Sequence, residues 1–428
     1  MKALILNSGL GHRMGVITKE RPKCMTFDSL NILRTSIHNC KKMRIPHRIQ
    51  KRIGKFHEWL LGRCVLWFYH LPTKKNKIVF IKDNGKGYAC NLKYIAQEII
   101  RQHLPYDMVW LVNDLSEEMP SEIRKVSLNS VRAVFELATA HIFINNAKIP
   151  YRVKKKPTQK FIYIPHGQPG AKCDGADRKQ QGEFERLSIK HSEQTDVFVS
   201  MSSYHTQVIK DNFWVPTNAE IWECGFPRND MFYHDTIQKQ QEIRKKLNIP
   251  EGYKIALYAP TFRDNNKTEA YNLDLHRTLA ALEQKTGSKW MFFITLHPNF
   301  FWYKKPIYDF GEFIWNMSDY TDIHELMLVV DATITDYSSV ALDFSNTRRP
   351  VFLYASDIDE YKRMRGLKEM YFKYPFSLSK TNDELETAIQ NFDNDSYLPK
   401  LSEFYKIYGS FDDGHASERF VERLKNMI

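Results

Sequence analysis

The sequence of 428 residues has few of the features that mark exported or membrane-spanning proteins. No stretch approaches the ~18 consecutive apolar residues that cross a bilayer, and no apolar signal-peptide core follows the N-terminus. The cysteines have no paired spacing, which favours reduced thiols over a disulfide framework. They are Cys24, Cys40, Cys64, Cys90, Cys173 and Cys224. We therefore expect a protein that stays in the cytoplasm.

Common motifs for metals and nucleotides are also missing. No His-Glu-x-x-His, Cys-x-x-Cys, Walker loop or acidic Asp-x-Asp element stands out. We expect no structural metal, no ATPase activity and no tightly bound cofactor. A Mg²⁺ ion held loosely on a substrate is compatible with the sequence but is not indicated by it.

The composition is that of a folded protein with a basic surface. Hydrophobic residues make up 43% and charged residues 26%, and the length predicts two or three domains. The net charge of +12 attracts anionic partners such as lipid headgroups, nucleotides or nucleic acid. No nucleic-acid-binding motif accompanies this charge, so we do not expect nucleic acid as a partner.

Residues 1–27 form a segment of their own. MKALILNSGLGHRMG predicts a buried strand followed by a glycine-bearing turn. The segment resembles the start of a sugar-nucleotide nucleotidyltransferase. The matching residues are Gly9, Gly11, Arg13, Pro22 and Lys23. The remaining domain of such an enzyme does not follow, so we interpret this segment as a remnant.

Residues 28–76 contain a basic amphipathic stretch. Apolar residues share one side of a helical projection, namely Ile49, Ile53, Phe56, Leu60, Leu61 and Val65. Basic residues flank them, namely Lys51, Arg52, Lys55 and Arg63. The pattern is typical of a helix that lies in the plane of an anionic membrane surface. A helix that docks on the folded domain is the alternative interpretation.

Strands alternate with helices along the rest of the chain. The alternation predicts an α/β protein with two Rossmann-like, doubly wound domains, at residues 77–235 and 250–428, and a closing C-terminal helix. The first series of strands is 77–83, 107–114, 141–146, 160–167 and 196–200. The second is 254–262, 290–298, 313–317, 332–339 and 350–354. Two such domains facing across a cleft form the GT-B architecture, with ligands at the carboxyl ends of the strands.

Chemically versatile residues follow four of the predicted strands. They are His166 and Gly167, then Thr261 and Arg263, then His297, and finally Asp336, Ser338 and Ser339. The carboxyl ends of parallel strands meet at one edge of a sheet, where doubly wound folds bind ligands. These residues are therefore the candidate site.

The same segments resemble the CDP-glycerol glycerophosphotransferase family, which makes teichoic acids and related capsule polymers of bacterial cell walls. The resemblance covers about residues 77–425. It rests on YAPTFRDN (258–265), TLHPN (295–299), the segment 334–361, Arg365-Gly366 and FDDGHASERFVERL (411–424). The family's histidine-glycine-threonine motif is here HGQPGAK, with Gln168 in place of threonine.

The resemblance implies transfer of a polyol phosphate, most often glycerol phosphate, from a CDP-activated donor to a polymer hydroxyl, with release of CMP. His166 would be the general base, since an imidazole accepts protons near neutral pH. His297 would contact the donor phosphates, together with Arg263, whose fork binds two oxygens at once. Alternatively, His166 only orients a loop and His297 caps a strand end.

The segment that includes Ser338 and Ser339 is expected to form a pyrophosphate site at a helix start. Thr261 and Asp336 would share this site, and Asp343 would support it. An ordinary helix N-cap is the alternative for Asp336, Ser338 and Ser339. Weaker candidates are Gly167, Arg365, Asp412, Asp413 and Ser417. For Asp412 we favour capping of the C-terminal helix.

The implied partners are CDP-glycerol or CDP-ribitol, a lipid-linked polymer acceptor and an anionic membrane surface. These place the protein peripherally on the cytoplasmic face of the cell membrane. The sequence leaves open which polyol is transferred, whether one unit or many are added, and the oligomeric state. Two other functions remain: a GT-B glycosyltransferase that uses a nucleotide sugar, and a non-catalytic protein that binds a CDP-polyol.

Overall fold

The computed structural model describes residues 59–147, 155–167, 169–173, 175–177, 182–263, 269–296 and 308–428. The predicted remnant at 1–27 and most of the basic segment lie outside these residues. Among the described residues, no helix is long and apolar enough to cross a bilayer.

The first domain is built on a seven-stranded sheet with the order β3-β2-β1-β4-β5-β6-β7. Its described strands pair in parallel throughout. They are β1 (Lys74–Ile81), β2 (Asp107–Val112), β3 (Ile123–Ser127), β4 (Ala140–Asn145), β5 (Lys160–Tyr163), β6 (Val197–Ser200) and β7 (Glu220–Glu223). Its helices are α4 (Cys90–Arg101), α5 (Val131–Thr139), α6 (Glu183–Ser192) and α7 (Ser203–Asn212).

The second domain is built on a six-stranded parallel sheet with the order β10-β9-β8-β11-β12-β13. Its strands are β8 (Tyr253–Ala259), β9 (Lys289–Ile294), β10 (Ile314–Asn316), β11 (Ala332–Thr335), β12 (Val351–Tyr354) and β13 (Ser377–Ser379). Its helices are α9 (Leu275–Thr286), α10 (Ile323–Val329), α11 (Val340–Ser345), α12 (Ile358–Met364), α13 (Asn382–Gln390) and α14 (Asn394–Tyr408). The predicted α/β class with two parallel sheets is confirmed.

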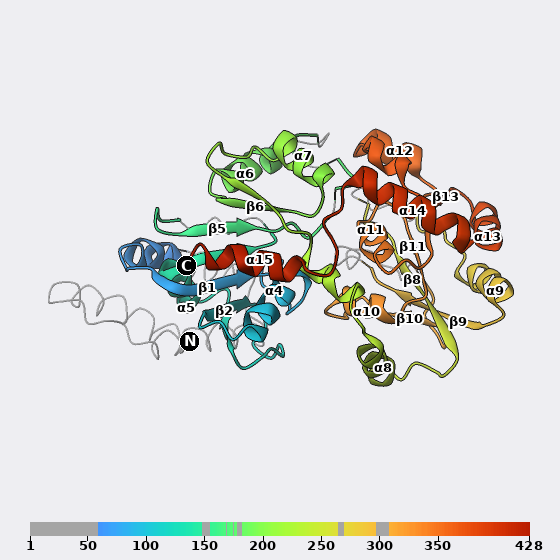
Figure 1. Cartoon of the computed structure of the whole chain (residues 1–428), viewed down its shortest axis with the longest axis horizontal. Coiled ribbons are helices and arrows are strands. Elements are labelled where there is room, and N and C mark those ends of the chain that lie inside the picture. Colours follow the sequence, from blue (N-terminus) through green and yellow to red (C-terminus); the bar gives the residue numbers. More distant parts are fainter. Residues whose placement is uncertain are drawn as a thin grey trace, which may run out of the picture.

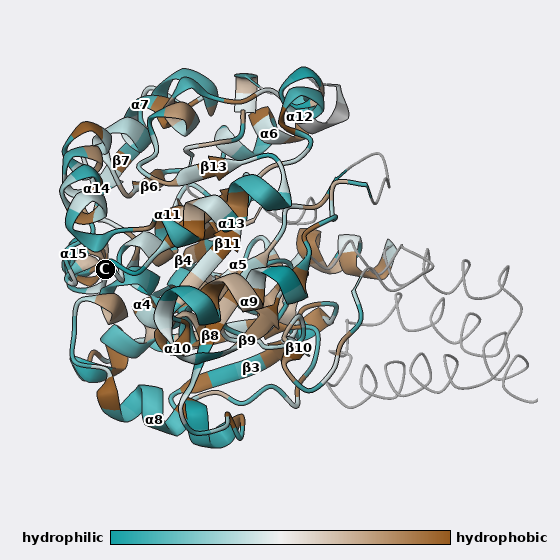
Figure 2. Cartoon of the chain, turned by 90° about the vertical axis from the view of Figure 1, so that its right-hand side faces the viewer, coloured by the Kyte–Doolittle hydropathy of each residue, from teal (hydrophilic) through white to brown (hydrophobic). Residues whose placement is uncertain are grey.

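Both sheets are covered on two faces, as the apolar runs in their strands require. In β1, Ile78 and Phe80 belong to one buried cluster, whereas Val79 and Ile81 belong to another beneath α5. The first of these clusters also includes Ile255 of β8, so the two domains share a continuous apolar core. Figure 2 shows the contrast between the hydrophobic strands inside and the largely hydrophilic surface helix α8 (Ile237–Lys246).

The chain passes between the domains twice. It leaves the first domain through the 3-10 helix η2 (Pro227–Phe232) and α8, and it returns after α14. The C-terminal helix α15 (Ala416–Lys425) then lies against α4 of the first domain, as Figure 1 shows. Phe420 of α15 meets Trp222 edge-to-face, with ring centroids 5.5 Å apart. The first domain is therefore completed by the last residues of the chain.

The helical segment 59–68 agrees, at its described positions, with the alternative interpretation of a helix that docks on the folded domain. Leu61 and Cys64 are buried against Val134 of α5, and Leu60 and Val65 pack beside them. The apolar face assigned to the membrane therefore docks on the protein at these positions, because burial against α5 removes it from water. Other residues, including Trp59, Leu66 and Trp67, are exposed. The more N-terminal part of the predicted amphipathic helix lies outside the described residues.

Candidate functional site

His166 follows β5 at the carboxyl edge of the first sheet. Its side chain is exposed, and its Nδ1 lies 3.4 Å from the carbonyl oxygen of Asn146, which follows β4. Asp83 follows β1 at the same edge. Burial raises the pKa of Asp83, but the charges of Lys82 and His166 outweigh this effect and bring the pKa below its ordinary value. An imidazole and a carboxylate thus share one edge of the sheet.

The loop after His166 enters the second domain. A Cβ atom on Gly167 would lie 3.8 Å from Oγ of Ser339, so Gly167 is a close neighbour of this serine side chain. A Cβ on Gly170 would lie 1.9 Å from the hydroxyl oxygen of Tyr374, which makes a side chain at this position incompatible with the packing. The carbonyl of Ala171 accepts a hydrogen bond from Lys368 at 2.9 Å. The loop therefore brings the candidate base to the second domain.

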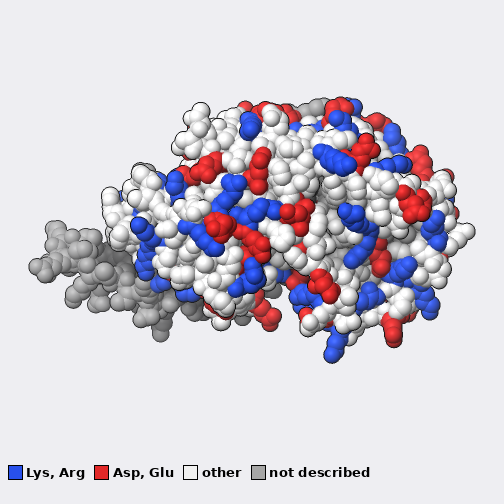
Figure 3. Space-filling view, in the orientation of Figure 1, with Lys and Arg blue, Asp and Glu red and all other residues white. Residues whose placement is uncertain are grey.

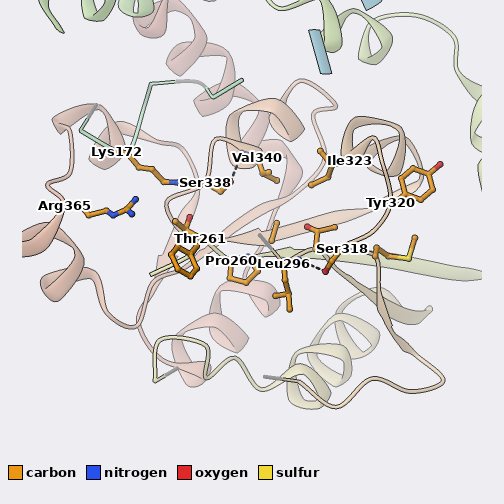
Figure 4. A pocket seen from close by; sticks show the side chains of 14 residues that line it. Lys172, Pro260, Thr261, Leu296, Ser318, Tyr320, Ile323, Ser338, Val340 and Arg365 are labelled. Atoms are coloured by element: carbon orange, nitrogen blue, oxygen red, sulfur yellow. Dashed lines mark hydrogen bonds between the residues drawn. The ribbon is translucent and has the colours of Figure 1, made fainter. Parts of the chain in front are cut away.

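A pocket of about 430 Å³ opens at the carboxyl edge of the second sheet. Its polar lining includes Lys172 from the His166 loop together with Thr261, Ser318, Ser338 and Arg365. Figure 4 shows Lys172 and Arg365 on the side of Ser338, with Tyr320 at the opposite end. The pocket thus has a basic end and an aromatic end.

Two threonine hydroxyls in this pocket are suited to a ligand. Oγ1 of Thr261 and Oγ1 of Thr295 are buried, and neither has a hydrogen-bond partner among the described residues. A buried hydroxyl without a partner is unfavourable, so such groups are often completed by a ligand or water. The backbone N–H of Thr261 donates to both carboxylate oxygens of Asp336, at 2.9 and 3.1 Å. Asp336 thereby fixes this wall of the pocket.

Arg263 does not face the pocket as a phosphate ligand would. Its guanidinium is buried and donates to Asp357 at 2.6 and 2.8 Å, and it pairs with Asp336 at 2.9 Å. The rings of Tyr337 and Tyr361 lie over it. Burial lowers the pKa of Arg263, but the two carboxylates outweigh this and raise it above its ordinary value. The N–H groups of Arg263 are hydrogen-bonded to these carboxylates, and the arginine therefore stabilises the loop that carries Asp336.

Asp343 does not line the pocket but forms a buried ion pair next to it. It is buried in α11 and forms an ion pair with Arg228 of η2 at 2.9 Å. Burial alone would raise its pKa, but the charge of Arg228 and the neighbouring His324 ring lower it to about 2. Asp343 is therefore ionised at neutral pH and links the two domains.

The capping role expected for Asp412 is wrong. The amides of Ala416 and Ser417, at the start of α15, donate to Asp230 at 2.8 and 2.7 Å. Asp412 accepts from the amide of Phe226 at 2.7 Å instead, because the chain crosses back to the first domain at this point. Asp413 pairs with Arg419 at 2.7 Å. None of the candidates Asp412, Asp413 and Ser417 lines the pocket.

His297 lies outside the described residues, so its predicted role stays a prediction. Sequence reasoning missed Asp83, Lys172 and Arg228. Lys172 ends the HGQPGAK motif, and Asp83 ends a predicted strand. The sequence position of each therefore marked it as a candidate for the site. Arg228 carried no such signal, because it belongs to a short 3-10 helix that follows no predicted strand. Among the described residues, no group of three or more His, Cys, Asp or Glu side chains is placed to hold a metal ion.

The chain belongs to the CDP-glycerol:poly(glycerophosphate) glycerophosphotransferase family, whose pattern matches residues 64–426. This result confirms the family resemblance read from the sequence.

The chain is 30% identical over 413 residues to the teichoic acid poly(glycerol phosphate) polymerase of Bacillus subtilis (strain 168), covering 90% of this chain and 54% of that protein. It is 29% identical over 392 residues to the teichoic acid glycerol-phosphate transferase of Staphylococcus aureus, covering 88% of this chain and 99% of that protein. Thus it spans about half the length of the Bacillus subtilis and Staphylococcus epidermidis polymerases.

A solved structure of the wall teichoic acid polymerase TagF, a histidine-to-asparagine variant soaked with CDPG, has a similar fold. The TM-score is 0.74 at 27% identity, and the match covers 86% of this chain and 94% of that one.

Proposed function

We propose that this protein transfers a polyol phosphate, most favourably glycerol phosphate, from a CDP-activated donor to a hydroxyl of a lipid-linked cell-surface polymer. The observation that carries the proposal is the pocket in which Lys172 of the His166 loop meets Thr261, Ser338 and Arg365 of the second domain. The two domains have the GT-B arrangement, with the acceptor bound by the first domain and the donor by the second. Related proteins named for glycerol phosphate and for ribitol phosphate support a CDP-polyol donor.

The diphosphate of the donor fits the basic end of the pocket. Lys172 and Arg365 supply positive charge there, and the hydroxyls of Ser338 and Thr261 donate hydrogen bonds to phosphate oxygens. Asp336 and Arg263 hold this wall in place without touching the donor. His297 would contact the same phosphates. The cytidine occupies the end that Tyr320 lines.

The acceptor hydroxyl attacks the phosphorus atom that bears the polyol. The new bond joins the acceptor oxygen to this phosphorus, and the bond from the phosphorus to the bridging oxygen of CMP breaks. His166 takes the hydroxyl proton, since its exposed side chain lies at the junction where Gly167 adjoins Ser339. CMP leaves with the bridging oxygen, and the polymer is longer by one polyol phosphate.

Attachment to an anionic membrane surface is the proposed location. Trp59, Leu66 and Trp67 are 58%, 55% and 68% exposed, and they follow the helical spacing on one side of the segment 59–68. Arg63 is exposed beside them. Exposed tryptophans with a basic neighbour suit a lipid–water interface. On the face shown in Figure 3, basic and acidic side chains are intermixed, so this apolar helix is a more specific anchor than the overall charge.

The function is tested by incubating the purified protein with CDP-glycerol, CDP-ribitol and several nucleotide sugars in the presence of a synthetic lipid-linked acceptor. We expect release of CMP only from a CDP-polyol, with product masses that grow by one polyol phosphate. Replacement His166→Asn should lower this rate by about 100-fold or more while CMP still binds. Turnover of a sugar donor alone would support the glycosyltransferase alternative, and binding without turnover would support the non-catalytic one.

A further inference from the structure

Arg228 occupies a buried position at the junction of the two domains. It lies in η2, where the chain leaves the first domain, and only 1% of the residue is exposed. Its guanidinium stacks on the ring of Phe226, 4.8 Å from the ring centroid. A buried charge is strongly unfavourable unless it is paired and hydrogen-bonded, so the partners of its two terminal nitrogens indicate what it does. One of these partners is Sγ of Cys90 in α4, 3.2 Å from Nη1.

The partners of Arg228 come from both halves of the proposed site. Nη1 donates to the carbonyl oxygen of His166 at 2.5 Å. Nη2 donates to both carboxylate oxygens of Asp343 in α11, at 3.1 and 2.9 Å. Ser338 and Ser339 immediately precede α11. A rigid, planar group therefore joins the backbone of the candidate base to the helix that follows the donor-binding serines.

The polar contacts continue from Asp343 across the same junction. His324 lies between Asp343 and Asp322, with ring nitrogens 3.5 Å from each carboxylate. Lys93 of α4, in the first domain, pairs with Asp322 at 2.8 Å. These residues are all buried. The chain of contacts crosses between the domains at both ends, so it resists a sliding of α11 relative to the His166 loop.

We propose that Arg228 is a positioning residue for the transfer reaction, which sets the distance between His166 and the donor phosphates. This inference rests on the proposed function. Arg228 touches no reacting atom; it acts through the carbonyl of His166 and through Asp343. Without it, the donor still finds its pocket in the second domain, but the base no longer reaches the acceptor hydroxyl. A misplacement of about 1 Å is enough to slow a reaction by roughly 100-fold.

The test compares Arg228→Met and Arg228→Lys with the control Lys77→Met. Lys77 forms an equally buried ion pair with Glu136, 2.6 Å long, between β1 and α5 within the first domain. We expect Arg228→Met to lower kcat by about 100-fold, with the donor KM and the affinity for CMP changed by less than about threefold. Arg228→Lys, which keeps the charge but loses the fork, should restore part of kcat. Lys77→Met should lower Tm and leave kcat unchanged well below that temperature.

Each outcome decides the inference. An Arg228→Met protein with wild-type kcat, or with kcat lost in proportion to donor affinity, overturns it. If Arg228→Met does not fold, Asp343→Asn replaces it, because this isosteric change weakens the ion pair between Arg228 and Asp343. An unchanged kcat of Asp343→Asn then overturns the inference. A loss of kcat without a loss of donor affinity supports it. A wild-type protein that releases no CMP from any CDP-polyol refutes the proposed function itself, which separates the two failures. Binding of CMP is measured by calorimetry in every variant.

Discussion

Asn229 donates a hydrogen bond to Asp412 at 2.6 Å, although the two residues are 183 positions apart in the sequence. The residues on either side of Asn229 make similar long-range contacts, Arg228 with Asp343 and Asp230 with the start of α15. Three consecutive residues of η2 therefore bind three later parts of the chain, namely Asp343 in α11, Asp412 and the start of α15. The junction between the domains is polar and specific at its centre, although apolar packing surrounds it.

Asp412 should make the stability of the protein depend on pH. Burial and the nearby carboxylates of Asp343 and Asp230 raise its pKa to about 7, despite hydrogen bonds from Phe226 and Asn229. The folded state then binds a proton that the unfolded state has released, between about pH 4 and pH 7. This stabilising contribution is complete below about pH 4 and is lost as the pH rises through about 7.

The variant Asp412→Asn checks this prediction, since an amide does not titrate. Oδ1 of Asn229 has no partner among the described residues, so a rotated Asn229 amide could accept from the new side chain. We expect the free energy of unfolding of the wild type, relative to the variant, to fall by roughly 1–3 kcal/mol between about pH 5 and pH 8. Denaturant titrations at several pH values measure it. A difference that does not change with pH contradicts the prediction.

Lys172 and Arg365 should bind the donor rather than drive the chemistry. Replacing either with methionine removes a charge-assisted hydrogen bond to phosphate, which is worth about 1.5–3 kcal/mol. We expect the donor KM and the Kd for CDP to rise by about tenfold or more, with a smaller dependence on salt. The control is Lys380→Met, because Lys380 is exposed and pairs with Asp359 on α12. Equal KM values for the three variants and the wild type would rule out this role.

Trp59 and Trp67 should contribute to membrane binding. The double variant Trp59→Ser, Trp67→Ser is expected to bind anionic phosphatidylglycerol vesicles about tenfold less tightly. The substitutions remove two exposed indole rings, and with them the apolar area that these rings would bury in the lipid. The control is Leu378→Ser, Ile407→Ser, which removes two other exposed apolar side chains. Co-sedimentation at low salt is the measurement. Equal losses in both double variants would show that the effect is not specific to this helix.

Gly170 should tolerate no side chain. A Cβ atom would meet the hydroxyl of Tyr374 and would lie 2.9 Å from Cδ1 of Leu342. We expect Gly170→Ala to lower the free energy of unfolding by about 1–3 kcal/mol. Adding Tyr374→Phe should recover part of the loss, since it removes the nearest atom. The control Gly311→Ala should have little effect, because no neighbouring atom lies within 4 Å of its Cβ position. Thermal unfolding of the wild type and of these three variants is the measurement.

The sequence predicted the central strands of both sheets but not all of the edges. KIVFI in β1 and WMFFI in β9 are apolar runs that require burial on two faces. The missed strands β3, β7 and β13 each lie at an edge of a sheet. Their sequences, IRKVS, EIWE and SLS, are short or polar, because an edge strand has one neighbour and partial exposure to water. Nothing in such a sequence distinguishes a strand from a loop.

The candidate site was predictable where it follows a strand and not where it depends on tertiary contacts. Thr261 and Ser338 line the pocket as expected from their position. Arg263 has the same sequence signal, but its engagement by Asp336 and Asp357 depends on how three segments of the second domain meet. Arg228 could not be predicted, because its partners His166 and Asp343 lie in different domains. Charge and spacing identify residues that matter, whereas packing decides whether they touch the substrate.

The return of α15 to the first domain means that two stretches of backbone, and not one, connect the halves of the molecule. A single tether would permit one half to swivel on the other. A pair of tethers restricts the motion to bending about the line that joins them. Opening for substrate entry should thus be a hinge motion about the line that joins the two connections. Cutting the chain between α14 and α15 would also allow one domain to rotate relative to the other.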